Sequence, residues 1–397
     1  MARRIAILGA GILGSSAALF LARRGFEVTL FDAAECPFSG ASRWNEGKIH
    51  LGFIYAGDPS LATARKVLPG GLRFKPLVES LIGRSLEGAT TATDDTYLVH
   101  PESVAPLEAA EAYFRAVADL VREEPDAGGY LVDVRGCRAE RLSPAELEAC
   151  ADPRTVLAGL RVPERSVDTN WVADRFVEAL EAEPRIRLAM GTRVTGLEGA
   201  FQGPWKVLGS EGADGPFDGV INALWEGRLA IDRSLGLLPS VPWTHRYRLS
   251  LFAHTEESIE APSAIVSVGP FGDLKNYTGH DFYLSWYPAG LVAQGGDVEP
   301  PALPTVDPEA LSAAILENLA RYIPAAARIG EKATRMTLAG GWVFAHGQGS
   351  LADPAATLHR RDRIGIQQHG TYFSIDTGKY SIAPWLAEEV AARIAGA

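Results

Sequence analysis

Three glycines near the start of the chain are spaced so that their backbone can hold a diphosphate. Gly9, Gly11 and Gly14 form a GxGxxG pattern directly after an apolar run. The first glycine permits a tight turn, the second lets a phosphate approach the backbone, and the third permits close packing of a helix on a strand. Free N–H groups and the positive end of a helix dipole attract phosphate at such a turn. We expect these glycines, with Ile12 and Leu13 between them, to bind the diphosphate of a nucleotide.

An acidic residue closes the next apolar run. Asp32 lies 18 residues after Gly14 and ends the sequence EVTLFD. A carboxylate at the end of such a strand accepts hydrogen bonds from a ribose 2′-OH and repels a 2′-phosphate. We place Ala33 beside it as a further cofactor contact. The pattern predicts a nucleotide with an unmodified ribose, and by itself it does not choose between FAD and NAD.

The elements that position these residues lie in the first 32 residues. Residues 3–8 (RRIAIL) predict a short buried strand, residues 11–24 have helical periodicity, and Gly25 ends that helix. Residues 27–32 predict a second strand, rich in β-branched and apolar side chains. Together they make a strand–helix–strand unit of the Rossmann type, with the glycines at its first turn.

Helix and strand patterns continue along the rest of the chain. Helical periodicity is found at 59–82, 101–124, 168–182, 307–322 and 383–395. Asp168 is the expected N-cap of the third of these helices. Strand-like runs at 186–190, 192–198, 205–209 and 218–223 are expected to return to the first sheet, and 371–376 predicts a strand before the last helix. Aromatic-rich strands within 243–297 predict an antiparallel sheet in a second lobe.

Further segments beside the predicted strands carry small and polar residues. They are 39–52 (SGASRWNEGKIHLG), 191–195 (GTRVT) with 220–225 (VINALW), and 371–384 (TYFSIDTGKYSIAP). With the glycine turn, these segments resemble the D-amino-acid oxidase family of FAD-dependent oxidoreductases, which also contains glycine oxidase, sarcosine oxidase, glycerol-3-phosphate dehydrogenase and L-2-hydroxyglutarate dehydrogenase. The resemblance extends over most of the chain as separated motifs. It implies that the nucleotide is FAD.

The resemblance also implies which residues contact the cofactor. The family's small-residue loop runs along the FAD pyrophosphate and beneath the flavin ring, which assigns this role to Ala41, Ser42, Asn45, Gly47, Lys48 and Ile49. In the family a valine backbone meets the adenine and a strand end passes close to the nucleotide, which corresponds here to Val194, Asn222, Ala223 and Trp225. Leu224 stands where the family pattern usually has a glycine, so the backbone path departs from the pattern at this point.

The last matching segment carries a candidate for charge stabilisation. By the resemblance, Gly378, Lys379 and Tyr380 lie at the start of a helix whose N–H groups face the O2 and N1 edge of the flavin. A cationic Lys379, or the helix dipole, would stabilise negative charge on the reduced ring. We therefore expect Lys379 to contribute to both cofactor binding and catalysis.

The predicted fold is α/β (α+β), with a Rossmann-type FAD-binding domain and an interleaved antiparallel-sheet substrate domain. We expect FAD-binding parts at 1–80, 161–238 and 336–397. A helical cap of the substrate domain is expected at 81–160, and its antiparallel sheet at 239–335. Neither an internal repeat nor a low-complexity linker separates the two lobes.

Strand alternation indicates a substrate site in the aromatic-rich lobe. Arg246 and Arg248 share one strand face, and Tyr283, Ser285 and Tyr287 share a face of the next expected strand. A guanidinium can hold a substrate carboxylate or phosphate by two parallel hydrogen bonds. We name Arg246 and Tyr283 as candidate catalytic residues, and the alternative for each is a place on a solvent-facing strand.

His50 follows the small-residue loop and is a further catalytic candidate. An imidazole there would act as a base, hydrogen-bond the flavin or carry a covalent bond to it; the alternative is a buried histidine that satisfies backbone groups. The sequence does not decide between these. Weaker candidates for the substrate site are Arg43, Trp44, Tyr55, His346 and Arg361.

Composition restricts the compartment and the partners. A chain of 397 residues, 47% of them hydrophobic, can form more than one domain, and a net charge of -11 with no basic block disfavours nucleic acid. Because no run of about 18 apolar residues occurs, we expect a soluble protein without a membrane span. Three cysteines without a CxxC pair favour the reducing cytoplasm and predict no metal site. HExxH, GxSxG and P-loop patterns do not occur.

These observations predict an FAD-dependent oxidase or dehydrogenase with a small-molecule substrate. It would remove a hydride from the CH–NH carbon of an amino acid or amine, or from the CH–OH carbon of a 2-hydroxy acid or sugar-like molecule, to give an imine or a carbonyl. Oxygen or another electron acceptor would then reoxidise the flavin. The alternatives are an NAD-dependent dehydrogenase and a catalytically inactive flavin-binding protein. The sequence does not indicate the substrate, the acceptor, covalent flavin attachment or the oligomeric state.

Overall fold

The start of the chain forms the strand–helix–strand unit that the sequence predicts. In the computed structural model, which describes residues 2–396, β1 (Arg4–Leu8) is followed by α1 (Ile12–Arg23) and β2 (Glu27–Phe31). β1 pairs in parallel with β2 on one side and with β12 (Gly219–Asn222) on the other. The turn from β1 into α1 therefore lies at the carboxyl edge of a parallel sheet, where α/β folds bind their ligands.

A six-stranded sheet surrounds β1. Its order is β19-β20-β12-β1-β2-β8, completed by β8 (Ile186–Ala189), β19 (Gly365–His369) and β20 (Tyr372–Asp376). All neighbours are parallel except β19 and β20, which form an antiparallel pair. Ile5, Ala6, Ile7 and Leu8 of β1 are completely buried. Such a continuous apolar run is typical of a central parallel strand that is covered on both faces.

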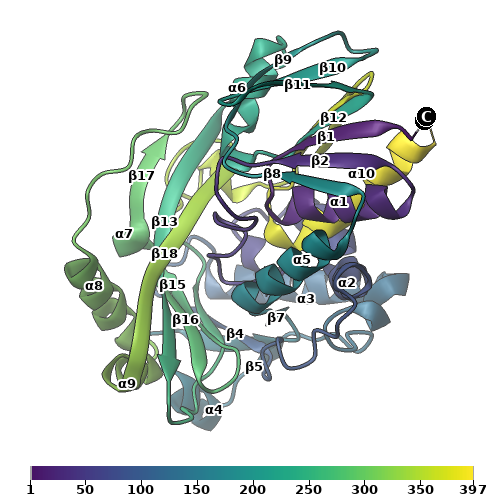
Figure 1. Ribbon diagram of the computed structural model, residues 1–397. Coiled ribbons are helices and arrows are strands. Elements are labelled where there is room, and N and C mark those ends of the chain that lie inside the picture. Colours follow the sequence, from purple (N-terminus) through teal and green to yellow (C-terminus); the bar gives the residue numbers. More distant parts are fainter. Residues whose placement is uncertain (1, 397) are drawn as a thin grey trace.

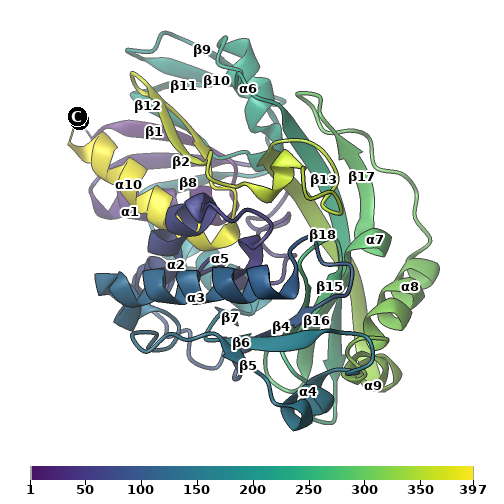
Figure 2. The ribbon, with the colours of Figure 1, turned by 180° about the vertical axis from the view of Figure 1, so that it is seen from behind.

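Helices from four distant parts of the chain cover one face of this sheet. α1 packs against α10 (Ala383–Ala395) and α5 (Thr169–Ala182), and α10 packs against α2 (Ala62–Ile82). Seen from behind, α3 (Leu107–Glu123) lies below α2, which contacts both α3 and α10 (Figure 2). Their apolar faces and the sheet enclose the largest core cluster of the molecule. The final helix thus packs against the first one, and both ends of the chain belong to the helical layer on this face of the sheet.

The opposite face is covered by a small antiparallel sheet, which differs from the prediction. β9 (Val194–Glu198), β10 (Trp205–Gly209) and β11 (Gly212–Phe217) form a three-stranded sheet of order β11-β10-β9. The prediction that 192–198 and 205–209 return to the first sheet is wrong. Trp205 and Val207 instead pack on the face of that sheet, beside Leu8. Alternating apolar residues indicate that one face of a strand is buried, but not which sheet the strand joins.

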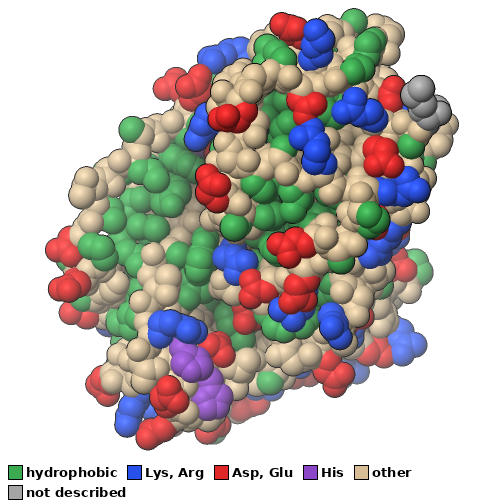
Figure 3. Space-filling model, viewed as in Figure 1, with side chains coloured by type: hydrophobic (Ala, Val, Ile, Leu, Met, Phe, Trp, Pro, Cys, Tyr) green, Lys and Arg blue, Asp and Glu red, His purple; other side chains and the backbone are tan. Residues whose placement is uncertain are grey.

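A nine-stranded sheet forms the second lobe (Figure 1). Its order is β17-β13-β16-β15-β14-β4-β6-β5, and β18 also pairs with β13. The strands are β4 (Asp95–Val99), β5 (Glu140–Arg141), β6 (Ala158–Val162), β13 (Trp243–Thr255), β14 (Ala264–Ser267), β15 (Gly272–Asn276), β16 (Asp281–Trp286), β17 (Leu291–Gly295) and β18 (Ala333–His346). The pairs are antiparallel, as predicted, except that β4 and β14 are parallel. Hydrophobic side chains gather over β13, β17 and β18 in the space-filling view (Figure 3).

Two parts of this sheet are missing from the sequence prediction. The stretch 81–160, expected as a helical cap, also supplies β4, β5 and β6. β18 pairs with β13 over its whole length, yet its apolar pattern is interrupted by Gly340 and Gly341. A Cβ atom on Gly340 would lie 1.7 Å from the carbonyl oxygen of Arg248, and one on Gly341 would lie 2.6 Å from the Cα of Ala41. The glycines weaken the strand signal because two backbones approach β18 closely.

Shorter elements complete the fold. They are α4 (Pro144–Cys150), α6 (Arg228–Ser234), α7 (Tyr287–Gly290), α8 (Pro308–Ala320), α9 (Ala325–Lys332), and the two-stranded sheet of β3 (Lys48–Ile49) and β7 (Arg165–Ser166). The fold is mixed α/β with parallel and antiparallel sheets, as predicted. The five-part division of the chain stays a prediction, and its break at 335 falls within β18. None of the helices in residues 2–396 is long and apolar enough to cross a bilayer.

The N-cap of α5 is the residue that the sequence predicts. One carboxylate oxygen of Asp168 accepts hydrogen bonds from the backbone N–H groups of Asn170 (2.9 Å) and Trp171 (3.2 Å). We expect Asp168→Ala to lower the free energy of unfolding by about 1 kcal/mol, because two N–H groups lose their acceptor. Chemical denaturation of the purified protein measures this change. Glu178→Ala, on the exposed side of α5, is the matched control, and equal losses in both variants would contradict the capping role.

Candidate cofactor and substrate cavity

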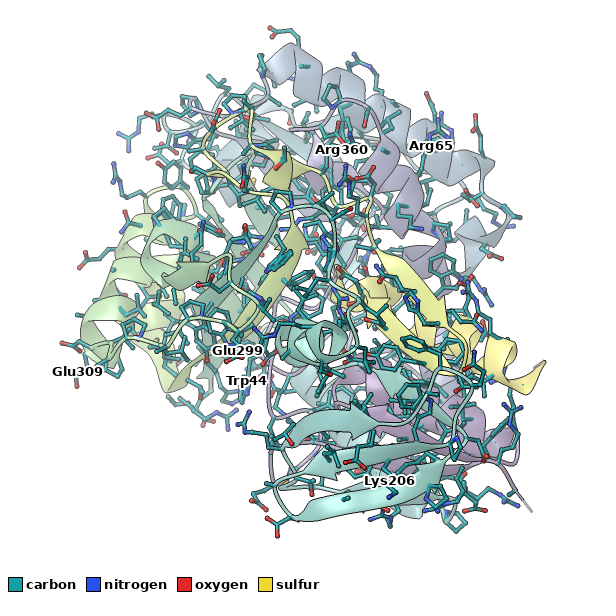
Figure 4. The ribbon with its side chains drawn as sticks, turned by 90° about the horizontal axis from the view of Figure 1, so that it is seen from above. Trp44, Arg65, Lys206, Glu299, Glu309 and Arg360 are labelled. Atoms are coloured by element: carbon teal, nitrogen blue, oxygen red, sulfur yellow. The ribbon has the colours of Figure 1, made fainter. Side chains whose placement is uncertain are left out.

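A cavity of about 740 Å³ is lined by residues of both lobes. Its walls come from the turn after β1, the end of β2, the loop before β3, strands β13, β15, β16 and β18, and the segment before α10. Trp44 of the loop, labelled in Figure 4, lines this cavity and contacts Phe252 of β13 edge to face, with 5.2 Å between ring centroids. A volume of this size is typical of cofactor and small-molecule sites.

The first and third glycines of the turn have the steric roles that the sequence predicts. Gly9 lies at φ +100°, and a Cβ atom there would lie 2.5 Å from the carbonyl oxygen of Ala223. A Cβ atom on Gly14 would lie 1.8 Å from the carbonyl oxygen of Gly9. Gly14 therefore permits α1 to pack on the turn and does not itself line the cavity. Gly9 and Ala223 both line it.

The N-terminus of α1 opens into this cavity. Gly11, Ile12 and Leu13 line it, and the backbone N–H of Ile12 donates a hydrogen bond to Oγ of Ser42 (3.0 Å). A Cβ atom on Gly11 would lie 2.8 Å from the same Ser42 oxygen. The glycine thus keeps a cradle open beside free N–H groups and the positive end of the helix. This arrangement fits the diphosphate of a nucleotide, as predicted from the motif.

Asp32 lies next to this cradle at the end of β2. Its two carboxylate oxygens accept hydrogen bonds from the backbone N–H groups of Ala10 (2.7 Å) and Ala34 (2.9 Å). Both Asp32 and Ala33 line the cavity. Because a carboxylate offers about four acceptor positions, Asp32 retains capacity for a ribose hydroxyl. Its assignment to the ribose stays a prediction.

The loop before β3 is folded partly by residues expected to contact the cofactor. The side chain of Asn45 donates to the carbonyl oxygen of Ala41 (2.9 Å) and accepts from the N–H of Gly47 (2.8 Å). Gly47 lies at φ +63°, and a Cβ atom on it would lie 1.9 Å from the carbonyl oxygen of Val167. Ala41, Ser42 and Asn45 line the cavity, whereas Gly47 does not. Gly47 is required by packing against the segment that follows β7.

Lys48 and Ile49 lie next to each other in the sequence but differ in whether they line the cavity. Lys48 lines the cavity, and its ammonium lies 2.9 Å from Asp95 and 3.6 Å from Glu164. Burial acts to lower the pKa of Lys48, but these two carboxylates outweigh it and raise the pKa above its usual value. Lys48 is therefore a fixed cation in the floor of the cavity. Ile49 is fully buried in β3 and does not line the cavity.

The segment before α10 brings a second lysine into the cavity. Gly378, Lys379 and Tyr380 all line it. Gly378 lies at φ +60°, and its N–H donates to Asp376 (2.9 Å), which holds the turn in place. Burial lowers the pKa of Lys379 to about 8, although Glu46 acts in the opposite direction. Lys379 thus changes charge close to physiological pH.

The two faces predicted from strand alternation meet in the cavity. Arg246, Arg248, Tyr283, Ser285 and Tyr287 all line it, which confirms the alternation, although Tyr287 begins α7 rather than ending β16. Nη1 of Arg246 donates to the hydroxyl of Tyr287 (2.8 Å), and the guanidinium of Arg248 lies 4.7 Å from the centre of the Tyr287 ring. The hydroxyl of Tyr283 is hydrogen-bonded to Ser250 (2.9 Å).

His50 lines the cavity as a neutral ring. Its side chain is almost fully buried, and its Nδ1 has no hydrogen-bond partner within residues 2–396. Burial holds the pKa of His50 well below 6.5, and Lys379 and Lys48 lower it further. An unpartnered buried nitrogen is costly, so Nδ1 is an unsatisfied polar atom in the wall of the cavity.

Several predicted residues lie outside the lining. Val194 does not line the cavity, although its neighbour Arg193 does. The amide of Asn222 is buried and donates to Tyr372 (2.9 Å), Asp232 (3.2 Å) and the carbonyl oxygen of Arg228 (3.0 Å). Because these three acceptors satisfy it, Asn222 stabilises the end of β12 instead of presenting its side chain to the cavity. Trp225 does line the cavity.

Among the weaker candidates, Trp44 and Arg361 line the cavity, whereas Arg43, Tyr55 and His346 do not. Sequence reasoning missed three cavity carboxyls: Glu46, Glu226 and Asp273. Burial raises the pKa of Glu226 to about 7. Glu46 stands within the loop matched to the family, but no spacing rule distinguishes it from a surface glutamate. Its burial depends on strands far away in the sequence.

Comparisons with known proteins agree with this geometry. A family model described as FAD dependent oxidoreductase (DAO) matches residues 4–363. A tRNA 5-methylaminomethyl-2-thiouridine biosynthesis bifunctional protein from Delftia acidovorans is 55% identical over 281 residues, which are 65% of this chain and 38% of that protein. A D-amino acid dehydrogenase from Chromohalobacter salexigens is 28% identical over 204 residues, which are 49% of this chain and 45% of that protein. The matches therefore span less than half the length of either relative.

Solved structures share the fold over nearly the whole chain. Iminodiacetate oxidase from Chelativorans has a TM-score of 0.68 at 18% identity and covers 99% of this chain and 95% of its own. Glycine oxidase from Geobacillus kaustophilus has a TM-score of 0.65 at 15% identity, with 98% and 95% covered. The family match identifies the cofactor as FAD, so the NAD-dependent alternative is not supported. The chain belongs to the D-amino-acid oxidase (DAO) family of FAD-dependent oxidoreductases.

Proposed function

We propose that this chain oxidises the CH–NH group of a small amine or amino acid that carries an acidic group. The observation that carries the proposal is a single cavity lined both by the glycine turn and by Arg246 with its partner Tyr287. FAD, when bound, takes up the two electrons that this oxidation releases. The names of a relative and a structural neighbour, D-amino acid dehydrogenase and glycine oxidase, support an amine over a 2-hydroxy acid.

Residues near the glycine turn would bind different parts of FAD. Gly9, Gly11 and the N–H groups at the start of α1 would hold the diphosphate, and Ser42 would bond to it from the loop. Asp32 would accept from the ribose. Neither assignment requires a metal ion, because the helix N-terminus supplies the positive potential.

The residues at the substrate end of the cavity would bind and orient the substrate. Arg246 would hold the acidic group of the substrate, with the Tyr287 hydroxyl fixing the guanidinium. Tyr283 keeps its proton, because burial raises the pKa of its hydroxyl. His50 is a weak base, because burial lowers its pKa. Both are therefore hydrogen-bonding groups at neutral pH.

Product analysis tests the class of substrate. The FAD-loaded protein is incubated with matched amino acids, secondary amines and 2-hydroxy acids in the presence of oxygen or a dye acceptor, and the products are identified by mass spectrometry. We expect imine-derived carbonyl compounds together with ammonia or a released primary amine. Oxidation of the 2-hydroxy acids with the amines unchanged would contradict the proposal.

The panel also includes a nucleoside amine. The Delftia relative is named for a methylaminomethyl group on a tRNA thiouridine. The exclusion of nucleic acid rested on net charge, and this comparison gives it no support. Reaction of a nucleoside amine, or of the same amine within tRNA, would place a nucleotide next to the substrate amine. Reaction of free amino acids alone would exclude that class.

The charge of Lys379 gives a pH prediction. With a pKa of about 8, the fraction of Lys379 that carries a positive charge falls as the pH rises from 7 to 9. We expect the rate of flavin reduction by substrate to fall over the same interval. Lys379→Met should lower this rate about tenfold at pH 7 and remove the pH step, because the cation that is expected beside the flavin and that changes charge in this interval would be lost.

Rapid-mixing absorbance measurements from pH 6 to 10 follow this rate. Lys206→Met is the matched control, because Lys206 is an exposed side chain of β10, and it is labelled in Figure 4. We expect the control to keep the wild-type profile. A Lys379→Met enzyme that retains the wild-type pH step would assign the step to another group.

A further inference from the structure

Four buried or partly buried cationic side chains face the cavity without an ion-pair partner. They are Arg246, Arg248, Arg361 and Lys379. Within residues 2–396 none of them forms a salt bridge to a carboxylate; the guanidiniums bond to neutral oxygens of Tyr287, Ser285 and Phe344. Arg246 is 3% exposed and Arg361 is 9% exposed. Buried charges are rarely left unpaired, because desolvation costs several kcal/mol per ion.

Two of the four cations have an anionic neighbour in the cavity. Burial acts to raise the pKa of Glu46, but Lys379 and then Arg248 outweigh it, so this carboxylate is charged beside Lys379. The charge of Glu46 acts on Arg248 as well, whereas burial raises the pKa of Asp273, which accepts a hydrogen bond from Ser285. Glu46 is therefore the anion that faces both Lys379 and Arg248.

Arg246 and Arg361 have neither a salt bridge nor a share in the charge of Glu46 within residues 2–396. Burial, followed by the charge of Arg246, lowers the pKa of Arg361 to about 10, so the two guanidiniums repel each other across the cavity. The carboxylate of Asp376 attracts Arg361 electrostatically but forms no salt bridge with it; its direct contacts are His346 (3.2 Å) and Arg228 (3.4 Å), and Arg228 also pairs with Asp232 (3.0 Å). Nε of Arg246 has no hydrogen-bond partner within residues 2–396. The diphosphate cradle at the start of α1 uses other residues, so FAD does not supply the missing anions there.

We propose that the substrate carries two negative charges, one held by Arg246 with Tyr287 and the other by Arg361. This inference rests on the proposed function, because it names the class of amine that the same site takes. The class is an amino dicarboxylate, an iminodicarboxylate, or an amine that bears a phosphate monoester. A single carboxylate would leave one guanidinium buried and uncompensated. Arg361 is therefore a specificity-determining residue, which selects the second acidic group.

Ligand binding to the FAD-loaded protein tests this without turnover. The probes are propionate, butyrate and valerate, the dicarboxylates malonate, succinate and glutarate, and methyl phosphate. Changes in the flavin absorbance spectrum and in melting temperature report binding. We expect the best dicarboxylate to bind about tenfold or more tightly than the monocarboxylate of equal carbon number. If methyl phosphate binds more tightly than every dicarboxylate, the two charges belong to one phosphate.

Variants of Arg361 distinguish its contribution to anion binding from that of Arg246. Arg361→Gln should lower dicarboxylate affinity to that of the monocarboxylates while changing monocarboxylate affinity less than about twofold, and Arg361→Lys should restore part of the difference. Arg360→Gln is the matched control, because Arg360 is exposed, ion-paired with Asp362 and labelled in Figure 4. FAD content shows that each variant folds. Equal weakening of both ligand classes by Arg361→Gln, or equal affinity of both for the wild type, would overturn the inference.

The charge assignment and the proposed function can fail independently of each other. If dianions bind as expected but no amine is oxidised, the function fails and the charge assignment stands. If amines with one acidic group are oxidised as well as those with two, the function stands and the second acidic group is excluded.

Discussion

Gly11→Val is expected to abolish the retention of FAD. Gly11 has φ -76° and ψ -174°, an extended conformation that valine adopts without strain, so the variant should fold. Its Cβ would lie 2.8 Å from Oγ of Ser42, and its methyl groups would fill the cradle beside the N–H of Ile12. A diphosphate then has no access to these amide groups. The effect is steric and local, which makes it the largest that the geometry predicts for the cofactor.

The flavin-to-protein ratio of the purified variant measures this effect. Gly136→Val is the matched control, because a Cβ atom on Gly136 meets no atom within 4 Å. We expect wild-type flavin content in the control and almost none in Gly11→Val, with similar circular dichroism in both. A wild-type yield of holoprotein from Gly11→Val would contradict the assignment of the diphosphate to this turn.

Arg246→Met is expected to have the largest effect on turnover. Arg246 is buried, and Tyr287 holds its guanidinium by a 2.8 Å hydrogen bond, so the charge is positioned before substrate arrives. Loss of a buried charge-assisted contact costs about 2–5 kcal/mol, which lowers kcat/KM by about 30-fold to several thousand-fold. FAD content should stay at the wild-type level, because Arg246 lies outside the diphosphate cradle.

Steady-state kinetics with the best amine measure this loss. Arg335→Met is the matched control: Arg335 lies on β18, paired opposite His254 of β13, and is exposed. Its kcat/KM should equal that of the wild type. Unchanged kcat/KM in Arg246→Met would mean that the substrate's acidic group binds elsewhere.

The nucleotide end of the site could be predicted from sequence because its determinants are local. Gly9, Gly14 and Asp32 lie within one strand–helix–strand unit, and each glycine has a steric cause that short-range geometry fixes. Strand alternation also placed Arg246 and Tyr283 on cavity-lining faces, because side-chain direction has a period of two along a strand.

The rest of the site depends on contacts between distant segments. Glu46, Asp95 and Glu164 carry no sequence signal that distinguishes them from surface carboxylates, and only the packing of separate strands buries them. Asn222 was expected at the cofactor, but it lies next to Asp232 and Tyr372, which satisfy its amide. β18 escaped prediction because Gly340 and Gly341 serve the close approach of β13 and the loop at Ala41, not the strand itself.

The central claim is that FAD and an acidic amine share one cavity. Anaerobic titration of the FAD-loaded protein with amines that carry one or two acidic groups tests it most directly, with the visible absorbance of the bound flavin as the readout. The structure predicts complete bleaching by at least one amine, and no bleaching by the 2-hydroxy acid of the same carbon skeleton. A flavin that dithionite reduces, but that is reduced by the hydroxy acids and by none of the amines, would contradict the account.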